Sequence, residues 1–363
     1  MKFEKKDFVP FSESEIQKDG NGKYVLHPPI SPRENYLRAL YREEPMWIPQ
    51  RSDCVNFTPS IYPDNVARAF VIEAQPYPGE KGGKDIFGIP WTYIPVAGGS
   101  MVAPGTPPLL EEVSQWREKV VFPDIDQWDW AGSAEANKPF FEANKDKVII
   151  TWIFNGMFER LISFMEFENA AMALIDEDEQ EDVKALFQAL TDFYKKLIDH
   201  FVKYYPIDGI YMHDDWGAQQ SPFFSIDTCR EMLVPYMKQI TEHCHKHGLF
   251  YDFHCCGKSE DLAPCMIEAG MDAWCGQPLN DKLKLWKTYG DKLFIGVHSP
   301  YGPAHQAPED DAEIAETVER FMEPYKDFAP QRPFFIQDLR PTDRTRAAFY
   351  RYGRKLLTQA KKA

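Results

Sequence analysis

The sequence has little positive charge, no long apolar run and no regular cysteine framework. Its 363 residues include 41 Lys and Arg against 56 Asp and Glu, which gives a formal net charge of −15. Because nucleic-acid binding needs clustered Lys and Arg, this balance disfavours a nucleic-acid partner. No stretch reaches the roughly 18 consecutive apolar residues of a transmembrane helix, and the first residues have no apolar signal-peptide core. The seven cysteines follow no framework spacing, which favours a reduced, cytoplasmic protein.

Motifs that mark three common enzyme classes are also missing. No Gly-x-Gly-x-x-Gly follows a strand-like run, so the phosphate loop of a dinucleotide-binding fold is absent. The chain also has no Walker-type loop and no Gly-x-Ser-x-Gly nucleophile elbow. The hydrophobic content of 44% is nevertheless ample for a large core.

From about residue 147 onward, apolar strand-like runs alternate with helical patterns. The expected strands span residues 148–153, 208–212, 248–254, 272–275, 293–298 and 333–338. The expected helices span residues 156–172, 179–204, 227–247, 259–268, 281–289, 311–325 and 343–359. Such alternation indicates parallel β-α units. A first strand at 46–49 and one more in a less regular region bring the count to about eight, which predicts a TIM-like (β/α)8 barrel.

The predicted organisation is an N-terminal arm over residues 1–30 and a single barrel domain over 31–363. Ser31 as N-cap, Pro32 in the first turn and Glu34 three residues after the cap predict the first helix of the domain. Residues 52–108 are rich in Pro, Gly and aromatics, with short strands expected near 69–72 and 92–96. We interpret this segment as an irregular excursion whose aromatics form either core or a pocket wall.

Three potential metal ligands, His254, Cys255 and Cys256, end one of the expected strands. Because successive side chains of a strand point to opposite faces, His254 and Cys256 point one way and Cys255 the other. An imidazole and a thiolate on one face suit zinc, which in catalytic sites has three protein ligands and one open position. Cys275, at the end of the next strand, is the candidate third ligand. The alternative is a buried histidine beside two ordinary core cysteines.

Polar side chains also follow the other strand ends, which is where the active sites of barrels of this kind form. We expect Asp214 and Asp215 to hold a substrate by hydrogen bonds or to act as general acid or base. His298 is a further candidate catalytic residue, and His298 and Asp338 compete with Cys275 for the third metal position. The residues expected to contact a substrate are His213, Trp216, Gln337 and Asp338.

A second group of histidines, His243, His245 and His247, lies near the end of an expected helix. Imidazoles in the last turn complement the negative end of the helix dipole. We therefore interpret these three side chains as solvent-facing residues of a helix end, and not as a metal site.

Six short segments together follow the pattern of a known superfamily. They are Ser31-Pro32-Arg33-Glu34-Asn35-Tyr36-Leu37-Arg38-Ala39-Leu40, Asp208-Gly209-Ile210, Asp214-Asp215-Trp216-Gly217, Val234-Pro235-Tyr236-Met237-Lys238, His254-Cys255-Cys256-Gly257 and Phe294-Ile295-Gly296. In these segments the chain resembles the uroporphyrinogen decarboxylase superfamily, over roughly residues 31–360. The resemblance implies a TIM-type barrel, in agreement with the strand count.

That superfamily contains porphyrin decarboxylases and cobalamin-dependent methyltransferases. The decarboxylases carry an N-terminal Arg-Gln-Ala-Gly-Arg segment that grips propionates, and Pro49-Gln50-Arg51 does not match it. The methyltransferases carry His-x-Cys on the strand that here ends in His254 and Cys256, so the resemblance implies zinc at these two residues. Those relatives place a third ligand, a cysteine, near the last strand, which here ends in Gln337-Asp338.

The resemblance to the methyltransferase branch implies a zinc-assisted enzyme that works with a corrinoid protein carrying the cobamide. The methyl group would move between the cobalt and a small methylated substrate, such as a methoxylated aromatic, or an acceptor. Zinc would act as a Lewis acid. The alternatives are a decarboxylase of porphyrin-like acids and a non-catalytic relative that binds a corrinoid or another ligand.

Overall fold

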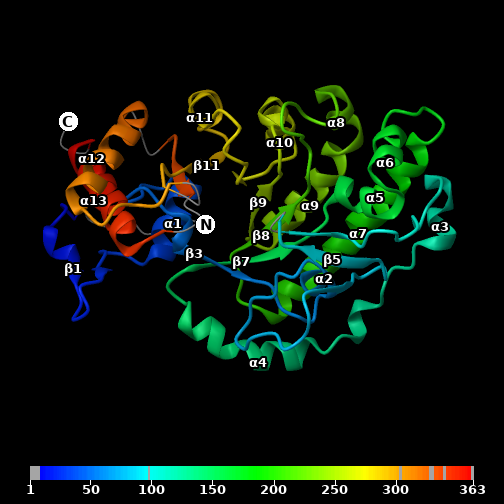
Figure 1. Ribbon diagram of the computed structural model, residues 1–363, viewed down its shortest axis with the longest axis horizontal. Helices are drawn as coiled ribbons and strands as arrows, with labels where there is room; N and C mark the ends of the chain where they lie inside the picture. The colour runs from blue at the N-terminus through cyan, green and yellow to red at the C-terminus, as the bar shows by residue number, and fades with distance from the viewer. Residues whose placement is uncertain (1–8, 97–98, 302–304, 327–330, 338–340, 361–363) are drawn as a thin grey trace. The chain divides into compact units, whose positions relative to one another are not determined.

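The chain divides into two compact units. Figure 1 labels the helices and strands of both. The computed structural model describes residues 9–96, 99–301, 305–326, 331–337 and 341–360. Unit 1 comprises Met1–Val55, Lys145–Val148 and Asp272–Ala363, and unit 2 comprises Asn56–Asn144 and Ile149–Met271. No helix among the described residues combines the length and the apolar character that crossing a membrane requires.

Unit 2 contains a parallel sheet of β7 (Val148–Ile153, whose first residue belongs to unit 1), β8 (Gly209–His213) and β9 (Phe250–His254). Nearly every residue of these strands is buried, as expected for a parallel sheet, whose two faces are both covered. The helices of this unit are α2 (Pro63–Ala67), α3 (Trp116–Lys119), α4 (Trp130–Ala143), α5 (Met157–Met165), α6 (Phe167–Ala173), α7 (Gln180–Tyr204), α8 (Ile226–Met232), α9 (Val234–Lys246) and α10 (Ala263–Glu268).

The irregular segment before α4 folds around a small antiparallel sheet and a buried cation. Its strands are β4 (Gly82–Lys84), β5 (Pro90–Ile94) and β6 (Gly99–Val102). Strand β5 confirms the strand expected near residue 92, whereas Ile72 makes only an isolated bridge to Thr58. The fully buried guanidinium of Arg160 on α5 binds the carboxylates of Asp64 and Asp85, which attaches this segment to the helix.

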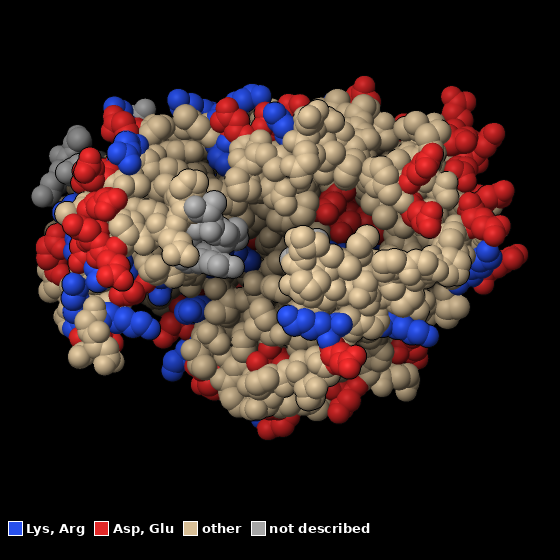
Figure 2. Space-filling view, viewed as in Figure 1, with Lys and Arg blue, Asp and Glu red and all other residues tan. Residues whose placement is uncertain are grey.

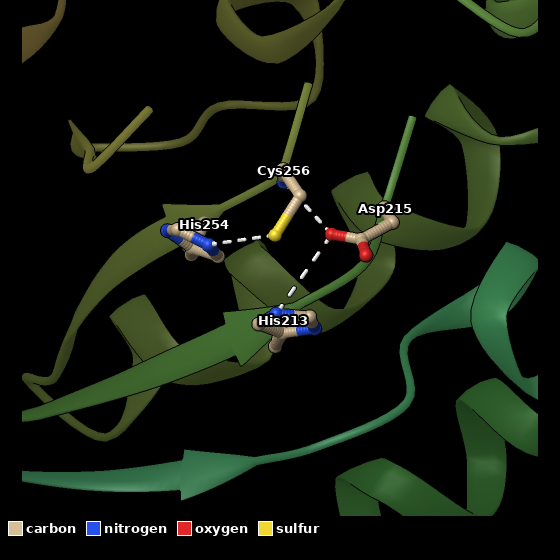
Figure 3. Close-up of side chains that lie close together, drawn as sticks. All are labelled: His213, Asp215, His254 and Cys256. Carbon is tan, nitrogen blue, oxygen red and sulfur yellow. Dashed lines mark hydrogen bonds and ion pairs between the residues drawn. The ribbon is translucent and has the colours of Figure 1, made fainter. Parts of the chain in front are cut away.

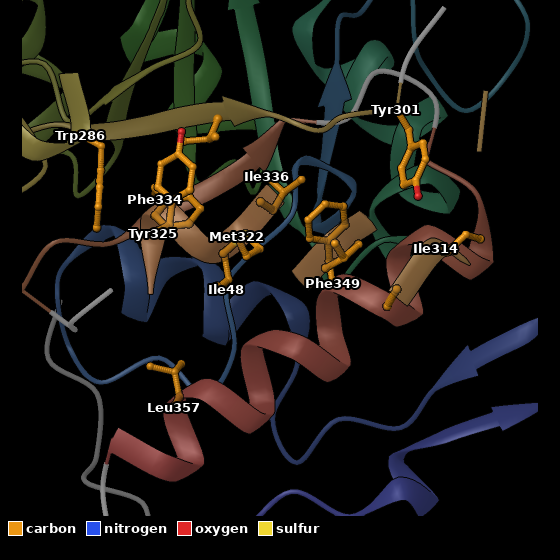
Figure 4. Close-up of a cluster of buried hydrophobic side chains, with 13 residues drawn as sticks. Ile48, Trp286, Tyr301, Ile314, Met322, Tyr325, Phe334, Ile336, Phe349 and Leu357 are labelled. Atoms are coloured by element: carbon orange, nitrogen blue, oxygen red, sulfur yellow. The ribbon is translucent and has the colours of Figure 1, made fainter. Parts of the chain in front are cut away.

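Unit 1 contains a second parallel run, formed by β10 (Ala273–Trp274), β11 (Phe294–His298) and β12 (Phe334–Gln337). Its helices are α1 (Pro32–Leu40), α11 (Lys282–Tyr289), α12 (Asp311–Met322) and α13 (Asp343–Ala360). Its core joins Ile48, Trp286, Met322 and Phe349 in one buried apolar cluster (Figure 4). The side chain of Ser31 accepts a hydrogen bond from the Glu34 backbone N–H, which confirms the predicted start of α1.

The N-terminal arm is more regular than its composition indicates, because β1 (Ile16–Lys18) and β2 (Tyr24–Leu26) form an antiparallel hairpin. The arm is attached to α13 through Glu15, whose carboxylate binds the buried guanidinium of Arg354 and the hydroxyl of Tyr350. Strand β3 (Cys54–Phe57) lies farther along the chain, where the first segment of unit 1 ends and unit 2 begins.

The prediction of a strand at residues 46–49 is wrong. The backbone N–H groups of Met46 and Trp47 donate to the side chain of Asn35, and the Trp47 carbonyl accepts from it, so these groups are not available for a ladder. Pairing begins only at Gln50, in a parallel bridge with Ile336. Within the described residues the parallel pairings do not close a ring of eight strands, so the α/β class with parallel strands is confirmed and a closed barrel is not.

Two predicted helices are interrupted. The helix expected over 156–172 breaks at Glu166, where φ is 65°, between α5 and α6. The helix expected over 227–247 is divided into α8 and α9 at Leu233, two residues before Pro235. Proline lacks the N–H that a continuing helix needs, which explains the second interruption.

Candidate metal centre

The candidate site lies at the carboxyl ends of β8 and β9 in unit 2. The two strands are parallel, and His213 is the register partner of His254. Each histidine is followed two residues later by another potential ligand, Asp215 after His213 and Cys256 after His254. Because side chains two apart along an extended chain share a face, the four side chains converge (Figure 3).

The four potential ligand atoms of His213, Asp215, His254 and Cys256 all lie within 4.8 Å of one another. Cys256 Sγ is 3.5 Å from His254 Nε2, and His213 Nε2 is 3.8 Å from Asp215 Oδ1. The two imidazoles are stacked, with ring centroids 4.9 Å apart and planes inclined by 27°. The Cys256 backbone N–H donates to Asp215 Oδ1 at 2.7 Å, which fixes this carboxylate beside the thiol.

The intervening residues Asp214 and Cys255 point to the opposite face and are fully buried. Cys255 Sγ lies 2.7 Å from the hydroxyl of Ser259, which confirms the prediction that it points away from His254 and Cys256. Asp214 accepts hydrogen bonds from the Glu159 backbone N–H at 2.7 Å and from the Trp216 indole at 2.9 Å. Asp214 therefore holds the first turn of α5. Trp216 is buried and packs against Phe253.

A close backbone approach holds the loop after Cys256 in place. Gly257 has φ of +80°, and a Cβ atom there would lie 1.9 Å from the carbonyl oxygen of Gly217. The Lys258 N–H donates to the Ala218 carbonyl at 2.7 Å. Only glycine fits this position without moving the backbone, so Gly257 lets the loops after β8 and β9 meet beside the four ligands.

Glu159, in the first turn of α5, is a member of the site that the sequence analysis missed. Its carboxylate accepts from Nδ1 of His213 and lies 3.2 Å from the Arg68 guanidinium. Burial alone would raise its pKa, but His213 and Arg68 lower the pKa of Glu159 to about 2. An ionised Glu159 favours a proton on Nδ1 of His213, so a neutral His213 would present its Nε2 lone pair to the other candidate ligands.

The ionisable groups around Cys256 favour a bound cation. Burial and the neighbouring Asp215 carboxylate raise the pKa of the Cys256 thiol well above its usual value. Burial and the charge of Glu159 likewise raise the pKa of Asp215. Burial lowers the pKa of His213, yet the Glu159 and Asp215 carboxylates raise it overall. A metal ion here would offset this crowding of negative charge, because a coordinated thiol is deprotonated by the ion.

The donor set fits zinc. Zn–S bonds of about 2.3 Å and Zn–N bonds of about 2.0–2.1 Å place a sulfur and a nitrogen ligand roughly 3.6 Å apart in a tetrahedron. The observed separation of Cys256 Sγ and His254 Nε2 is 3.5 Å. His213 and Asp215 offer a further nitrogen and an oxygen from the same side, and a His-ligand oriented by a carboxylate is typical of zinc sites.

A cavity of about 470 Å³ lies within unit 2 next to this group, which is a volume typical of small-molecule sites. Its lining combines apolar side chains with the carboxylates of Glu159 and Asp215; the apolar part is formed by Trp91, Met101, Ile162, Phe167, Phe223 and residues 102–108. The predicted excursion therefore supplies one wall of this cavity. Acidic side chains are visible at the bottom of a hollow on the face shown in Figure 2.

The other predicted site residues lie in unit 1 or outside the described residues. Cys275 is buried, and Gln337 ends β12. His298 Nε2 lies 2.9 Å from the Gly276 carbonyl, and burial lowers the pKa of His298 to about 4, so this imidazole is neutral near pH 7. Asp338 lies outside the described residues. The roles of these four residues stay predictions.

Comparison with family models and with curated proteins finds no match. Among solved structures, a methyltransferase from Methanosarcina mazei matches with a TM-score of 0.57 at 14% identity, over 89% of this chain and 99% of that chain. The two chains therefore share a fold. A sugar phosphate isomerase/epimerase from Parabacteroides distasonis has a TM-score of 0.28 at 10% identity, over 62% of this chain and 80% of that one. D-psicose 3-epimerase has a TM-score of 0.33 at 12% identity, over 65% and 85%.

Proposed function

We propose that this protein is a zinc-assisted methyltransferase that moves a methyl group between a small methylated substrate or acceptor and a cobamide carried by a corrinoid partner protein. The observation that carries the proposal is the convergence of His254, Cys256, His213 and Asp215 at the ends of two adjacent strands. A fold shared with a methyltransferase from Methanosarcina mazei supports it.

His254 and Cys256 would hold the zinc, with His213 or Asp215 as the third ligand and the remaining position open for substrate. The bound ion would supply Lewis-acid activation, lowering the pKa of a thiol acceptor or polarising an ether oxygen so that a phenolate leaves. Glu159 orients the His213 imidazole through Nδ1, and Asp215 holds the backbone N–H of Cys256. Asp214 holds the helix that carries Glu159.

The cavity favours a small, largely apolar substrate. Trp91, Phe167 and Phe223 offer flat aromatic surfaces, and the Pro-rich residues 102–108 form one side of the cavity. A methoxylated aromatic ring would bury its apolar faces there and bring its ether oxygen to the carboxylate end of the cavity. Water exclusion would protect a reactive methyl acceptor from side reactions.

The same cavity disfavours a porphyrinogen decarboxylase. A polycarboxylate substrate needs cationic partners that offset its charge. The described lining of the cavity includes Glu159, Glu166 and Asp215 but no Lys or Arg. We expect no decarboxylation of uroporphyrinogen by this enzyme.

The test is a screen of methoxylated aromatics, methylamines and thiols with a reduced corrinoid protein, followed by the absorbance change of the cobamide. Cys256→Ser should abolish the change for every active donor, whereas the matched variant Cys255→Ser should retain it, because the Cys255 thiol points to the opposite face. Equal loss of activity and of zinc in both variants would contradict the assignment.

A further inference from the structure

A second group of potential metal ligands lies in unit 2 away from the strand ends. It consists of Asp199 on α7, His243 on α9 and His247 at the C-cap of α9. Both imidazole Nε2 atoms approach the same carboxylate oxygen, Asp199 Oδ1, at 2.7 Å for His243 and 2.8 Å for His247. The side chains are 52%, 19% and 32% exposed, respectively, so an ion from solvent can reach them.

The two helices place these side chains together for simple geometric reasons. Residues four apart on a helix lie on the same face, so His243 and His247 are neighbours, with ring centroids 4.8 Å apart. His245, between them in sequence, is not part of the group. The interpretation of all three histidines as solvent-facing residues is therefore incomplete, because two of them converge on a carboxylate of another helix.

We propose that Asp199, His243 and His247 form a second site for a divalent transition-metal ion, separate from the centre at His254 and Cys256. Two imidazoles and one carboxylate are the ligand types that Zn²⁺ and Cu²⁺ accept, whereas Mg²⁺ and Ca²⁺ prefer oxygen alone. A tetrahedral zinc needs three protein ligands roughly 3.3 Å apart. Both imidazole nitrogens already lie closer than this to the carboxylate oxygen, and all three atoms lie within 4.8 Å of one another, so side-chain rotations would make room for the ion.

Two electrostatic effects favour the binding of a cation at this position. His243 and His247 lie at the C-terminal end of α9, where the helix dipole is negative and attracts a cation. The formal net charge of the chain, −15, acts in the same direction. The ion would join α7 to α9 and would thereby stabilise the packing of these two helices by mass action, because the unfolded chain does not hold the three ligands together.

The experiment is a Zn²⁺ titration of metal-free full-length protein against a chromophoric chelator. We expect two equivalents for the wild type, and one equivalent for each of His247→Ala and Asp199→Asn, with affinity for the lost ion reduced at least tenfold. His245→Ala is the matched control on the same helix and should retain both equivalents.

The two sites are distinguished with Cys256→Ser. Even if the centre at His254 and Cys256 binds no zinc, this variant should bind one equivalent at Asp199, His243 and His247. Zn²⁺ should then raise its melting temperature. The double variant Cys256→Ser/His247→Ala should show neither effect. Cobalt reports the difference independently, since only the strand-end centre has a thiolate to give charge-transfer absorption. Unchanged zinc affinity in both His247→Ala and Asp199→Asn, measured in the Cys256→Ser background, would overturn the proposal.

Discussion

At the scale of single residues, the candidate site depends on the carboxylate of Glu159, which is not itself a proposed metal ligand. Glu159 holds the His213 imidazole through Nδ1 and is itself held by Arg68. Carboxylates in this position fix the tautomer of a ligand histidine and increase its basicity. The function of His213 is thus determined as much by α5 as by the strand that carries it.

Replacing Glu159 tests this relation. Glu159→Gln keeps the size of the side chain but removes the charge that orients His213, so the zinc dissociation constant should rise about 10–100-fold. Competition with a chelator measures the constant directly. Glu166→Gln is the control, because Glu166 lines the same cavity, and its zinc affinity should stay within about twofold of wild type. Equal weakening in both variants would show that the charge of the cavity, and not the contact with His213, decides the affinity.

A second residue-scale prediction concerns pH and lies in unit 1. Burial raises the pKa of Asp53 to about 6, although Gln50, Arg346 and Lys147 oppose the shift. The folded protein therefore keeps the Asp53 proton after the unfolded chain has released it, so this carboxyl lowers the free energy of unfolding as pH rises from about 4 to 6. The loss is about 3 kcal/mol and is complete above the folded pKa.

Asp53→Asn should remove this decline, because the amide oxygen can still accept from the Gln50 N–H and does not ionise. Urea unfolding at a series of pH values from 4 to 7 measures the difference between the two proteins. A wild-type and a variant curve that run parallel over this range would show that Asp53 ionises normally in the folded state.

At the scale of elements, helix α5 links the excursion to the strand ends. Arg160 binds Asp64 and Asp85 from the excursion, while the preceding residue, Glu159, contacts His213, one of the candidate metal ligands. All three ion-paired side chains are fully buried. Removing one member of such a network leaves uncompensated charge, which is far more costly than losing an exposed pair.

We therefore expect Arg160→Met to lower the free energy of unfolding by about 3–5 kcal/mol, because Asp64 and Asp85 are left without their cation. Arg117→Met is the comparison, since its pair with Asp182 is 55% and 30% exposed, and it should cost at most about 1 kcal/mol. Denaturant unfolding measures both. Similar small losses in the two variants would mean that the buried carboxylates become protonated without penalty.

The element scale also shows what the sequence could predict. The face alternation of His254, Cys255 and Cys256 follows from strand geometry alone, and the structure confirms it. The grouping of His213 and Asp215 with these residues depends on the register of two strands, which a single sequence does not state. The same two-residue spacing in both segments is a signal that points to it.

Other elements were missed for local reasons. In the sequence, Glu159 looks like an ordinary acidic residue in the first turn of a helix. The turn at Asn155, which has a positive φ and precedes this helix, is visible only in the structure. The hairpin of the N-terminal arm has a usable signal in Asn21-Gly22, a frequent turn pair, and Gly22 has φ of +78°. The strand expected at 46–49 fails because Asn35 binds the backbone groups that a strand needs.

At the scale of the whole molecule, the proposed chemistry rests on unit 2. The four candidate metal ligands, the cavity and the excursion that forms one of its walls all belong to this unit. The chain shares its fold with a methyltransferase from Methanosarcina mazei, and the donor set of the strand-end residues fits the zinc that we propose. Methyl transfer and zinc binding are linked in this proposal. If the enzyme transferred methyl groups without zinc, the residues at the ends of β8 and β9 would not have the role that we propose for them.

The most direct measurement of this link is the initial rate of methyl transfer to cobalamin as zinc is added back to metal-free protein. The His247→Ala variant serves as the enzyme, so that Asp199 and His243 do not take up the ion. We predict a rate that rises in proportion to bound zinc and saturates at one equivalent per chain. A rate that is already maximal in the metal-free protein, and unchanged on zinc addition, would contradict the account.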